Sequence, residues 1–512
     1  MIDSRSVWSL VESRAEATPG ALFAVDGRDR ALTFAEYRHS ALRSAAGLAK
    51  LGIGAGTVVS WQLPTALESL VLAAALVRLG AVQSPILPIL REREVGFIVR
   101  QTHAHWLAVP PSFRGFDHAA MAREVAAGTP GLELLVVDGA LPDADPASLA
   151  PVAGPAAQGE PEVGWIFYTS GTTSEPKGAR HTDATLMAVG RAMVERLGLR
   201  PDDRVALVFP FTHVGGLGWL LAGLLSGCAQ IVVPIFGPDA IEALARHGVT
   251  QATAGTAFHQ TYLAAQRQRG GAPIFPRVRA FPGGGAPKPP ALHFDVKREL
   301  GGAGIVSGYG LTECPVATMG SPGDPDERLA HTEGRATAGV EIRIARPDGS
   351  AAAPGQDGEI LLRGPQLCRG YLDTALDAHA FGAQGFFRSG DLGHLTEDGY
   401  LVVTGRLKDV IIRKGENVSA KEIEDLLHEH PKVAEAAVIG LQDLERGERV
   451  CAVVVAKDPS DPLTFDELVA FLRGRKLATH KLPEQLELAS ELPRNSTGKV
   501  QKNALRSRLA TG

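Results

Sequence analysis

The sequence predicts a multidomain α/β protein built mainly from parallel sheets that are covered by helices. Three observations lead to this expectation: a length of 512 residues, a hydrophobic fraction of 45%, and short β-branched runs that alternate with amphipathic helical stretches. Single hydrophobic cores stop growing at roughly 250–300 residues, so a chain of this length divides into two or more domains. The charged fraction of 21% is typical of globular proteins and argues against collagen, coiled-coil and disordered classes.

The clearest alternation lies in the first half of the chain. Residues 57–63 are expected to form a buried strand, residues 66–79 a helix and residues 81–87 the next strand. Later apolar runs repeat the pattern at 106–109, 134–137, 230–233 and 304–306. Strands that alternate with helices pair in parallel, which predicts a doubly wound arrangement. The Pro- and Ala-rich stretch 139–162 is expected to be an exposed loop.

The pattern changes twice in the last third of the chain. Short strands with turn signals at 341–345, 358–363 and 400–404 predict a small antiparallel barrel or sheet. After Gly405 the pattern becomes compact α+β, with helices expected at 420–428 and 464–472 and strands at 433–439 and 450–456. We therefore expect a large N-terminal domain over residues 1–406 and a small C-terminal domain over residues 407–512.

The composition indicates which partners and which cellular compartment to expect. A net charge of −5 argues against a polybasic surface, so no nucleic-acid partner is predicted. The four cysteines are far apart and lack metal spacing, which favours reduced, buried thiols. The N-terminus resembles no targeting peptide, so a cytoplasmic location is expected. Residues 205–238 lack acidic and basic side chains, but Pro and Gly divide them into pieces shorter than the roughly 20 apolar residues of a span, so no integral membrane segment is expected.

The segment from Tyr168 to Gly178 carries the strongest functional signal. It follows an apolar run at 163–168 and places several hydroxyl side chains around Gly171 before it ends with Lys177. Hydroxyls, backbone N–H groups and a nearby lysine are the donors that a polyphosphate requires. Because Gly178 follows Lys177, the Walker spacing GxxxxGK[ST] is absent. The segment is interpreted as a phosphate-binding loop of another kind, although such a stretch on its own is more often an ordinary polar loop.

Five further segments accompany this loop in a characteristic order. They are Phe211–Gly216, Gly283–Pro287, Gly308–Glu313, Arg388–Leu392 together with Gly405–Asp409, and Pro493–Lys499. With the phosphate loop they resemble the motifs of the adenylate-forming superfamily, which includes acyl-CoA synthetases, luciferases and the adenylation domains of peptide synthetases. The resemblance spans nearly the whole chain. It implies that a carboxylate attacks the α-phosphorus of ATP to give an acyl-AMP, and that a thiol then displaces AMP, with ATP, Mg²⁺ and CoA as cofactors.

The resemblance also implies a role for individual residues. Those expected at the nucleotide are Thr169, Ser170, Gly171, Thr172, Thr173 and Lys177 at the phosphates, Gly284, Gly285, Ala286 and Tyr309 at adenine, and Asp391 and Arg406 at the ribose. Thr312 would contact the α-phosphate, Glu313 would bind Mg²⁺, and Lys499 would stabilise the transition state of adenylation. Taken singly, Glu313 and Asp391 could be solvated carboxylates and Lys499 a surface lysine. Because their motifs occur together in the order found in the family, a shared active site is favoured.

The second half-reaction is implied by the segment Arg413–Glu424. In relatives the small domain rotates about the position of Lys408 and brings the loop of Lys414, Gly415 and Glu416 to the thiol. Glycine at position 415 suits close approach of a pantetheine arm. Arg413 is equally well explained as part of a solvated charged face.

The acid is expected to be hydrophobic. The acyl pocket implied by the resemblance contains His213, Gly215, Gly216, Gly255 and Gly308. His213 matches the histidine or aromatic residue that relatives place near the carboxylate, which implies a catalytic role for it. Residues 208–220 contain no Asp to pair with an α-ammonium group, and an unpaired buried ammonium is costly. The small glycines suggest a wide cavity for a bulky acid, and His213 could alternatively be a packed core histidine. Residues 62–64, 84–94 and 113–118 are similar to the cyclohexanecarboxylate-CoA ligase branch, which implies an alicyclic or polycyclic acid.

Three other functions remain open from the sequence. The enzyme could pass its acyl-AMP to a carrier protein or partner enzyme instead of free CoA. It could be a nucleotide-binding protein without chemistry, but loss of Lys177, Glu313 or Lys499 would be the sign of that, and all three are present. A luciferase-like oxygenase has no local signature. A homodimer is one of the assemblies that the sequence allows.

Overall fold

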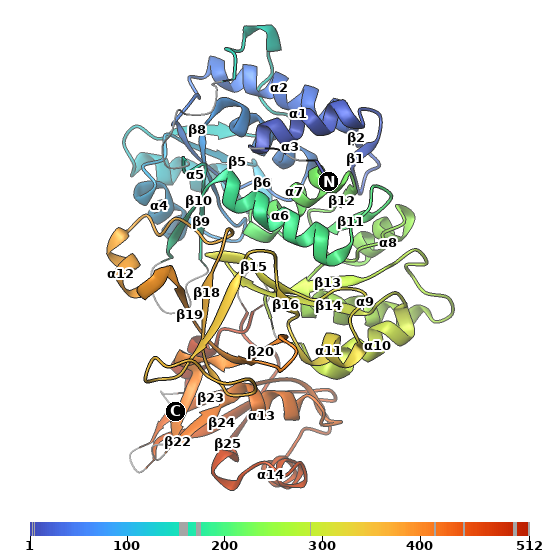
Figure 1. The fold of residues 1–512 in the computed structure, drawn as a ribbon, viewed down its shortest axis with the longest axis vertical. Coiled ribbons are helices and arrows are strands. Elements are labelled where there is room, and N and C mark those ends of the chain that lie inside the picture. Colours follow the sequence, from blue (N-terminus) through green and yellow to red (C-terminus); the bar gives the residue numbers. More distant parts are fainter. Residues whose placement is uncertain are drawn as a thin grey trace.

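The computed structural model describes residues 1–509 except 3, 5, 153–161, 170–175, 287, 414–415, 444–445 and 495–498. Its fold class is mixed α/β, as the alternating pattern predicts. Figure 1 shows the sheets stacked along the long axis of the molecule, with the N-terminal elements at one end and the strands that follow Arg406 at the other.

The largest sheet contains six strands and is mostly parallel. Its order is β10-β9-β4-β3-β5-β8, with an antiparallel pair between β10 and β9. The strands are β3 (Val58–Trp61), β4 (Val82–Pro85), β5 (Trp106–Val109), β8 (Glu133–Val136), β9 (Trp165–Tyr168) and β10 (Gly178–His181). The strands expected at 57–63, 81–87, 106–109 and 134–137 are thereby confirmed within one or a few residues.

Two four-stranded sheets form the middle of the molecule. One has the order β11-β12-β1-β2, and the other has the order β13-β14-β15-β16. Their strands are β1 (Leu22–Asp26), β2 (Ala31–Thr33), β11 (Arg204–Leu207), β12 (Ala229–Val232), β13 (Phe281–Gly284), β14 (Ile305–Leu311), β15 (Cys314–Met319) and β16 (Arg335–Ala336). Gln251 pairs in parallel with both Val205 and Ala280, so the two sheets are linked edge to edge.

The last two large sheets are mainly antiparallel, and the first of them confirms the antiparallel sheet expected at 341–404. They are β17-β18-β19-β20 and β22-β21-β24-β23, with β25 parallel to β24. Their strands are β17 (Glu341–Ala345), β18 (Gly358–Arg363), β19 (Phe387–Leu395), β20 (Leu401–Arg406), β21 (Val410–Arg413), β22 (Glu416–Ser419), β23 (Val433–Asp443), β24 (Gly447–Ala456) and β25 (Gln485–Ala489); a separate hairpin contains β6 (Ser112–Phe113) and β7 (Phe116–Asp117). The domain boundary at residues 406–407 stays a prediction.

Helices cover the faces of these sheets. They are α1 (Val7–Ala17), α2 (Phe34–Lys50), α3 (Leu67–Leu79), α4 (Glu92–Gln101), α5 (His118–Ala127), α6 (Asp183–Leu197), α7 (Val214–Ser226), α8 (Pro238–Arg246), α9 (Thr256–Arg269), α10 (Pro290–Leu300), α11 (Asp326–His331), α12 (Asp377–Ala380), α13 (Ala420–Leu427), α14 (Phe465–Gly474) and α15 (Lys502–Leu509). Local chemistry fixes their ends: Thr33 and Glu36 form a capping box at the start of α2, and Gly80 ends α3 with a left-handed conformation.

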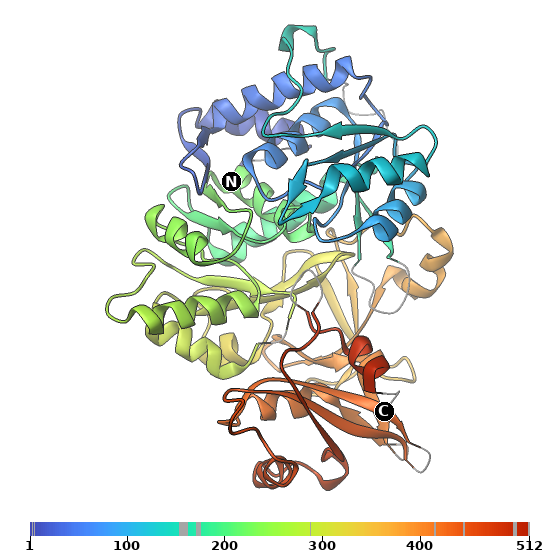
Figure 2. The ribbon, with the colours of Figure 1, turned by 180° about the vertical axis from the view of Figure 1, so that it is seen from behind.

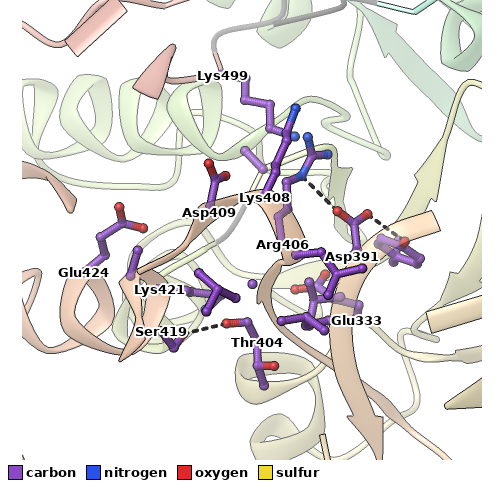
Figure 3. A pocket seen from close by; sticks show the side chains of 18 of the residues that line it. Glu333, Asp391, Thr404, Arg406, Lys408, Asp409, Ser419, Lys421, Glu424 and Lys499 are labelled. Atoms are coloured by element: carbon purple, nitrogen blue, oxygen red, sulfur yellow. Dashed lines mark hydrogen bonds and ion pairs between the residues drawn. The ribbon is translucent and has the colours of Figure 1, made fainter. Parts of the chain in front are cut away.

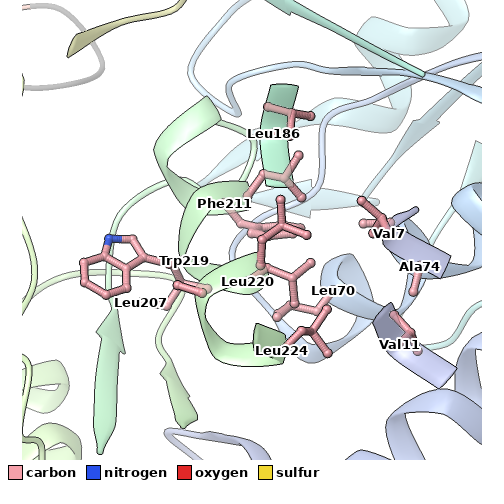
Figure 4. Close-up of a cluster of buried hydrophobic side chains, with 14 of the residues drawn as sticks. Val7, Val11, Leu70, Ala74, Leu186, Leu207, Phe211, Trp219, Leu220 and Leu224 are labelled. Carbon is pink, nitrogen blue, oxygen red and sulfur yellow. The ribbon is translucent and has the colours of Figure 1, made fainter. Parts of the chain in front are cut away.

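The uncharged stretch 205–238 folds as strand β11, helix α7 and strand β12, and α7 lies in the core. Figure 4 shows Leu220 and Leu224 of α7 packed between Phe211, Leu70 and the first helix. Nearly every residue of α7 is buried, which explains its continuous apolar sequence. The structure contains no helix, in the residues it describes, with the length and apolarity that crossing a membrane requires.

The C-terminal segment returns toward the larger body of the protein. In the view from behind (Figure 2), the stretch that carries α15 lies where the last sheet meets the preceding strands. Two ion pairs connect α15 to residues packed around the last sheet. Lys502 Nζ lies 2.7 Å from Oε1 of Glu424 on α13, and Arg506 lies 3.1 Å from Oδ1 of Asp409, which directly precedes β21. All four cysteines are free and buried, as expected, and burial raises the pKa of each thiol to about 12.

Candidate active site

One large cavity lies between the middle sheets and the C-terminal strands. It has a volume of about 1080 Å³ and is lined by parts of β13, β14, β19, β20 and α13, together with the segment before α15. The residues predicted for nucleotide, hinge and acid that line it are Gly255, Gly284, Gly285, Ala286, Gly308, Tyr309, Asp391, Arg406, Lys408 and Lys499. Segments that are far apart in the sequence therefore meet at this cavity.

Asp391 is a buried carboxylate that lines the cavity. It is 5% exposed, and it accepts a hydrogen bond of 2.8 Å from the Tyr309 hydroxyl. The guanidinium Nε of Arg406 lies 2.8 Å from its other oxygen. Strand register explains the pair, because Asp391 on β19 lies directly opposite Arg406 on β20. The carboxylate is thus held rigidly (Figure 3) and keeps lone pairs that can accept further hydrogen bonds.

Glycine is required where strands β13, β14 and β15 approach one another. A Cβ on Gly284 would lie 2.6 Å from the carbonyl oxygen of Gly308, and a Cβ on Gly308 would lie 2.8 Å from that of Thr318. Both separations are shorter than real contacts allow. The glycine motifs therefore maintain a flat backbone wall, which suits close contact with a planar base.

Lys499 reaches the cavity from the C-terminal segment. Figure 3 shows it beside Lys408 and Arg406, close to Asp391. Burial lowers the pKa of the ammonium to about 8; Arg406 and Lys408 also lower it, whereas Asp391 and Asp409 oppose the shift. Burial likewise lowers the pKa of Lys408. A site that concentrates positive charge in this way is prepared for an anionic ligand.

Glu313 lies in the turn between β14 and β15. It is 6% exposed, and burial raises the pKa of its carboxyl, while a hydrogen bond from the Tyr371 hydroxyl and the charge of Lys177 act in the opposite direction. The neighbouring Thr312 is fixed through its carbonyl oxygen, which accepts a hydrogen bond of 2.9 Å from Nε2 of His181. His181 and Tyr371 were not predicted, because neither belongs to a recognisable motif and both contacts join residues distant in sequence.

The base of the predicted phosphate loop is closed by two hydrogen bonds. The backbone N–H of Thr169 donates to the Lys177 carbonyl at 3.0 Å, and the Lys177 N–H donates to the Thr169 hydroxyl at 3.3 Å. Four predicted loop residues, Ser170, Gly171, Thr172 and Thr173, lie outside the described residues, as do Lys414 and Gly415. Glu416 is exposed at the start of β22 and does not line the described cavity.

The predicted acid pocket is only partly brought together. Gly255 and Gly308 line the cavity, whereas His213, Gly215 and Gly216 at the start of α7 lie outside its described lining. His213 caps α7 by accepting a hydrogen bond of 3.1 Å from the Gly215 N–H at Nδ1, and burial lowers its pKa to about 4.

The structure shows a reason for glycine at position 216 that the sequence did not reveal. A Cβ on Gly216 would lie 2.6 Å from the carbonyl oxygen of Phe211, so the tight entry into α7 requires glycine there. Gly218 likewise faces Met193 and Val189 of α6 at 3.1 Å. Packing therefore gives Gly216 and Gly218 a structural reason of their own, and the expectation of a wide acid cavity stays a prediction.

The donor set fits a magnesium ion that arrives with phosphates. The described residues contain no group of three or more His, Cys, Asp or Glu side chains that would hold a metal without substrate. Magnesium is commonly bound through one or two carboxylates together with substrate phosphates and water. The buried Glu313 can supply one such carboxylate.

Comparison with known proteins adds a family. The AMP-binding enzyme family matches residues 11–372, and the AMP-binding enzyme C-terminal domain matches residues 422–499. The medium-chain fatty-acid–CoA ligase of Escherichia coli is 32% identical, over 97% of this chain and 89% of that protein. The salicyl-AMP ligase / salicyl-S-ArCP synthetase of Mycobacterium tuberculosis is 35% identical, over 99% and 92%.

Two further comparisons agree with this result. A CoA ligase of Rhodococcus jostii, named for a methyl-dioxo-octahydroindenyl propanoyl group, is 32% identical over 96% of this chain and 97% of that protein. The structure of ATP-bound MatB from Rhodopseudomonas palustris superposes with a TM-score of 0.87 at 29% identity, covering 98% of this chain and 99% of the other. The chain therefore belongs to the AMP-binding enzyme family and is an AMP-forming ligase that activates a carboxylic acid as an acyl-adenylate.

Proposed function

We propose that the protein is an ATP- and Mg²⁺-dependent acyl-CoA synthetase for a hydrophobic, alicyclic or polycyclic carboxylic acid. The observation that carries the proposal is the convergence of Asp391, Arg406 and Lys499 on one cavity. A carboxylate that accepts ribose hydroxyls, beside a guanidinium and an ammonium that attract phosphate, is a donor and acceptor set that fits a nucleotide.

In the first half-reaction, a carboxylate oxygen of the acid attacks the α-phosphorus of ATP. The bond from that phosphorus to the oxygen bridging to the β-phosphate breaks, and pyrophosphate leaves with the electron pair. Both reacting groups are anions, so fixed cations lower the barrier. Lys499 supplies one positive charge, and the hydroxyl of Thr312 donates a hydrogen bond to the α-phosphate. Glu313 would hold Mg²⁺, which would neutralise part of the phosphate charge.

In the second half-reaction, the thiolate of CoA attacks the carbonyl carbon of the acyl-AMP, and AMP leaves with the electron pair. We infer that the segment after Lys408 rotates and brings Lys414, Gly415 and Glu416 to the pantetheine arm. Fixing the hinge tests this step directly. Lys408→Pro locks φ and should slow thioester formation much more than carboxylate-dependent ATP–pyrophosphate exchange; equal slowing of both would contradict a hinge role.

The lack of an anionic side chain in residues 205–238 supports an acid without an α-ammonium group. Residues 205–238 contain no charged side chain, and the lowered pKa of His213 leaves this histidine neutral at neutral pH. An α-ammonium group would have no anionic partner there, and burying it unpaired would cost several kcal/mol, roughly 2–7 even for a neutral polar group. The E. coli and R. jostii relatives are named for a fatty acid and a fused-ring acid.

A second candidate acceptor follows from one relative. The M. tuberculosis protein is named both as an AMP ligase and as a synthetase that loads ArCP. This chain could likewise transfer its acyl group to a carrier protein. Both acceptors use the same first half-reaction, so only the fate of the adenylate distinguishes them.

The test uses the full chain with ATP and Mg²⁺. Fatty, aromatic, alicyclic and polycyclic acids are screened by pyrophosphate release, and the products are then separated by mass spectrometry with and without CoA. We expect an acyl-CoA from an alicyclic or polycyclic acid as the preferred product. Accumulation of acyl-AMP with CoA unused would refute CoA as the acceptor and favour a carrier, and an α-amino acid as the preferred substrate would refute the acid class.

A further inference from the structure

Tyr371 contacts two residues of the proposed triphosphate site at once. Its hydroxyl donates a hydrogen bond to Oε1 of Glu313, and the ammonium of Lys177 lies 5.4 Å from the centre of its ring. The side chain is 2% exposed. No motif of the sequence marks this residue, and the reaction described above gives it no part.

The backbone of Tyr371 is fixed next to the phosphate loop. Residues 369–372 pair with β10, the strand that begins directly after Lys177. The Arg180 N–H donates to the Gly370 carbonyl and the Leu372 N–H to the Gly178 carbonyl, both at 2.9 Å. The Tyr371 N–H donates to a carboxylate oxygen of Asp377 at 2.8 Å. The phenol is therefore attached rigidly to the end of the loop.

The same segment also holds the main chain of Glu313. The backbone N–H of Cys368 donates to the Glu313 carbonyl at 2.8 Å. Glu313 is thus held twice from one short segment, at its backbone by Cys368 and at its carboxylate by Tyr371. The ring of Tyr371 packs against Ala179, Cys368 and Phe387, which restricts its rotation. The direction of the carboxylate is consequently set by Tyr371 and not by Glu313 alone.

We propose that Tyr371 is a positioning residue for the metal–nucleotide complex: its hydroxyl aims the Glu313 carboxylate at Mg²⁺, and its ring seats the ammonium of Lys177 toward the phosphates. A metal-binding carboxylate is usually oriented by a second hydrogen-bonding group, and losing that group weakens metal binding. The ring contributes through attraction between its π-face and the cation. The inference rests on the proposed function, because Glu313 binds Mg²⁺ only as part of an ATP site.

The decisive variant is Tyr371→Phe, which removes the hydroxyl and keeps the packed ring. The probe is Mn²⁺ with α,β-methylene-ATP, which cannot form an adenylate, and bound Mn²⁺ is measured by electron paramagnetic resonance. We expect Tyr371→Phe to weaken Mn²⁺ binding in the ternary complex about tenfold or more. In exchange assays the Mg²⁺ dependence should move to higher concentration, with the rate largely recovered at saturating Mg²⁺.

Tyr37→Phe is the matched control. Tyr37 is fully buried, and its hydroxyl donates to the carbonyl of Leu70 at 3.0 Å, so the substitution also removes one hydrogen bond from a buried phenol. This control should leave Mn²⁺ binding and the Mg²⁺ dependence unchanged. Wild-type Mn²⁺ binding by Tyr371→Phe would overturn the inference, and so would a rate loss that is the same at every Mg²⁺ concentration.

A double-mutant comparison separates positioning from general damage to the fold. If the hydroxyl acts through Glu313, Tyr371→Phe adds little to the loss of Mn²⁺ binding in a Glu313→Gln background. Additive losses would overturn the inference. If the wild-type protein bound no Mn²⁺–nucleotide at all, the proposed function itself would fail. The two failures are therefore distinguishable in one set of measurements.

Discussion

The charge of Lys499 gives a prediction whose size follows from the structure. Burial next to Arg406 lowers the pKa of this ammonium from 10.5 to about 8. At about 1.36 kcal/mol per pKa unit, keeping Lys499 charged at this buried position costs roughly 3 kcal/mol relative to water. Bound phosphate recovers part of this cost, so the charged form of Lys499 is more stable when ATP is bound than when it is absent.

The sign of the pH dependence follows from this pKa. A lysine is charged below its pKa, so Lys499 is about nine-tenths charged at pH 7 and about one-tenth charged at pH 9. Carboxylate-dependent ATP–pyrophosphate exchange should therefore fall about tenfold between these values. Exchange is measured at subsaturating ATP, because kcat/KM then reports groups of the free enzyme.

Two substitutions isolate the lysine. Lys499→Ala should lower exchange by about two orders of magnitude at pH 7, which is typical for removing one group that stabilises developing charge. Lys499→Arg keeps a positive charge that does not titrate between pH 7 and pH 9. The residual activity of this variant should therefore not decline above pH 8. Wild-type exchange that stays constant from pH 7 to pH 9 would refute the reasoning, and so would Lys499→Ala with wild-type exchange.

Three further predictions address the ribose site, the glycine wall and the core. Asp391→Asn should raise the KM for ATP about tenfold or more and leave the KM for the acid nearly unchanged, because a charged hydrogen-bond acceptor is lost at the ribose; an unchanged ATP KM contradicts that role. Gly308→Ala should lower the melting temperature and weaken ATP binding measured by calorimetry, since its Cβ would meet the Thr318 carbonyl oxygen, at a cost of about 1–3 kcal/mol; Gly27→Ala, with no atom within 4 Å, is the control. Arg14→Met should destabilise the protein by roughly 2–4 kcal/mol in urea unfolding, because the buried guanidinium donates to the carbonyls of Leu224 and Leu225; exposed Arg28→Met should have little effect, and equal stability of the two variants would contradict the reasoning.

Much of the fold could be predicted from the sequence because its signals are local. The run 106–109 coincides with β5, and the apolar segment 230–233 is displaced by one residue from β12. The breakers within 205–238 gave the strand, helix and strand in the right order. Hydrophobic period and turn residues determine these elements over a few positions, so distant contacts are not needed to recognise them.

The site was predictable where a role belongs to a motif. Asp391, Arg406 and Lys499 were expected together, and all three line one cavity. Tyr371 and His181 were missed, because each acts through one contact with a residue in another segment. The packing role of Gly216 was also missed, because it depends on contact with the backbone of Phe211.

The α/β class, the order of the chemical motifs and the lack of acidic and basic residues around α7 can all be recognised in the sequence. Which side chains meet depends on the tertiary structure: Tyr309 contacts Asp391, 82 residues away, and Tyr371 contacts Glu313, 58 residues away. The physical reason is the range of the forces involved. Backbone propensity and hydrophobic period act within one element, whereas a hydrogen bond between distant residues exists only after packing of the whole core has compensated for the entropy of closing the chain between them.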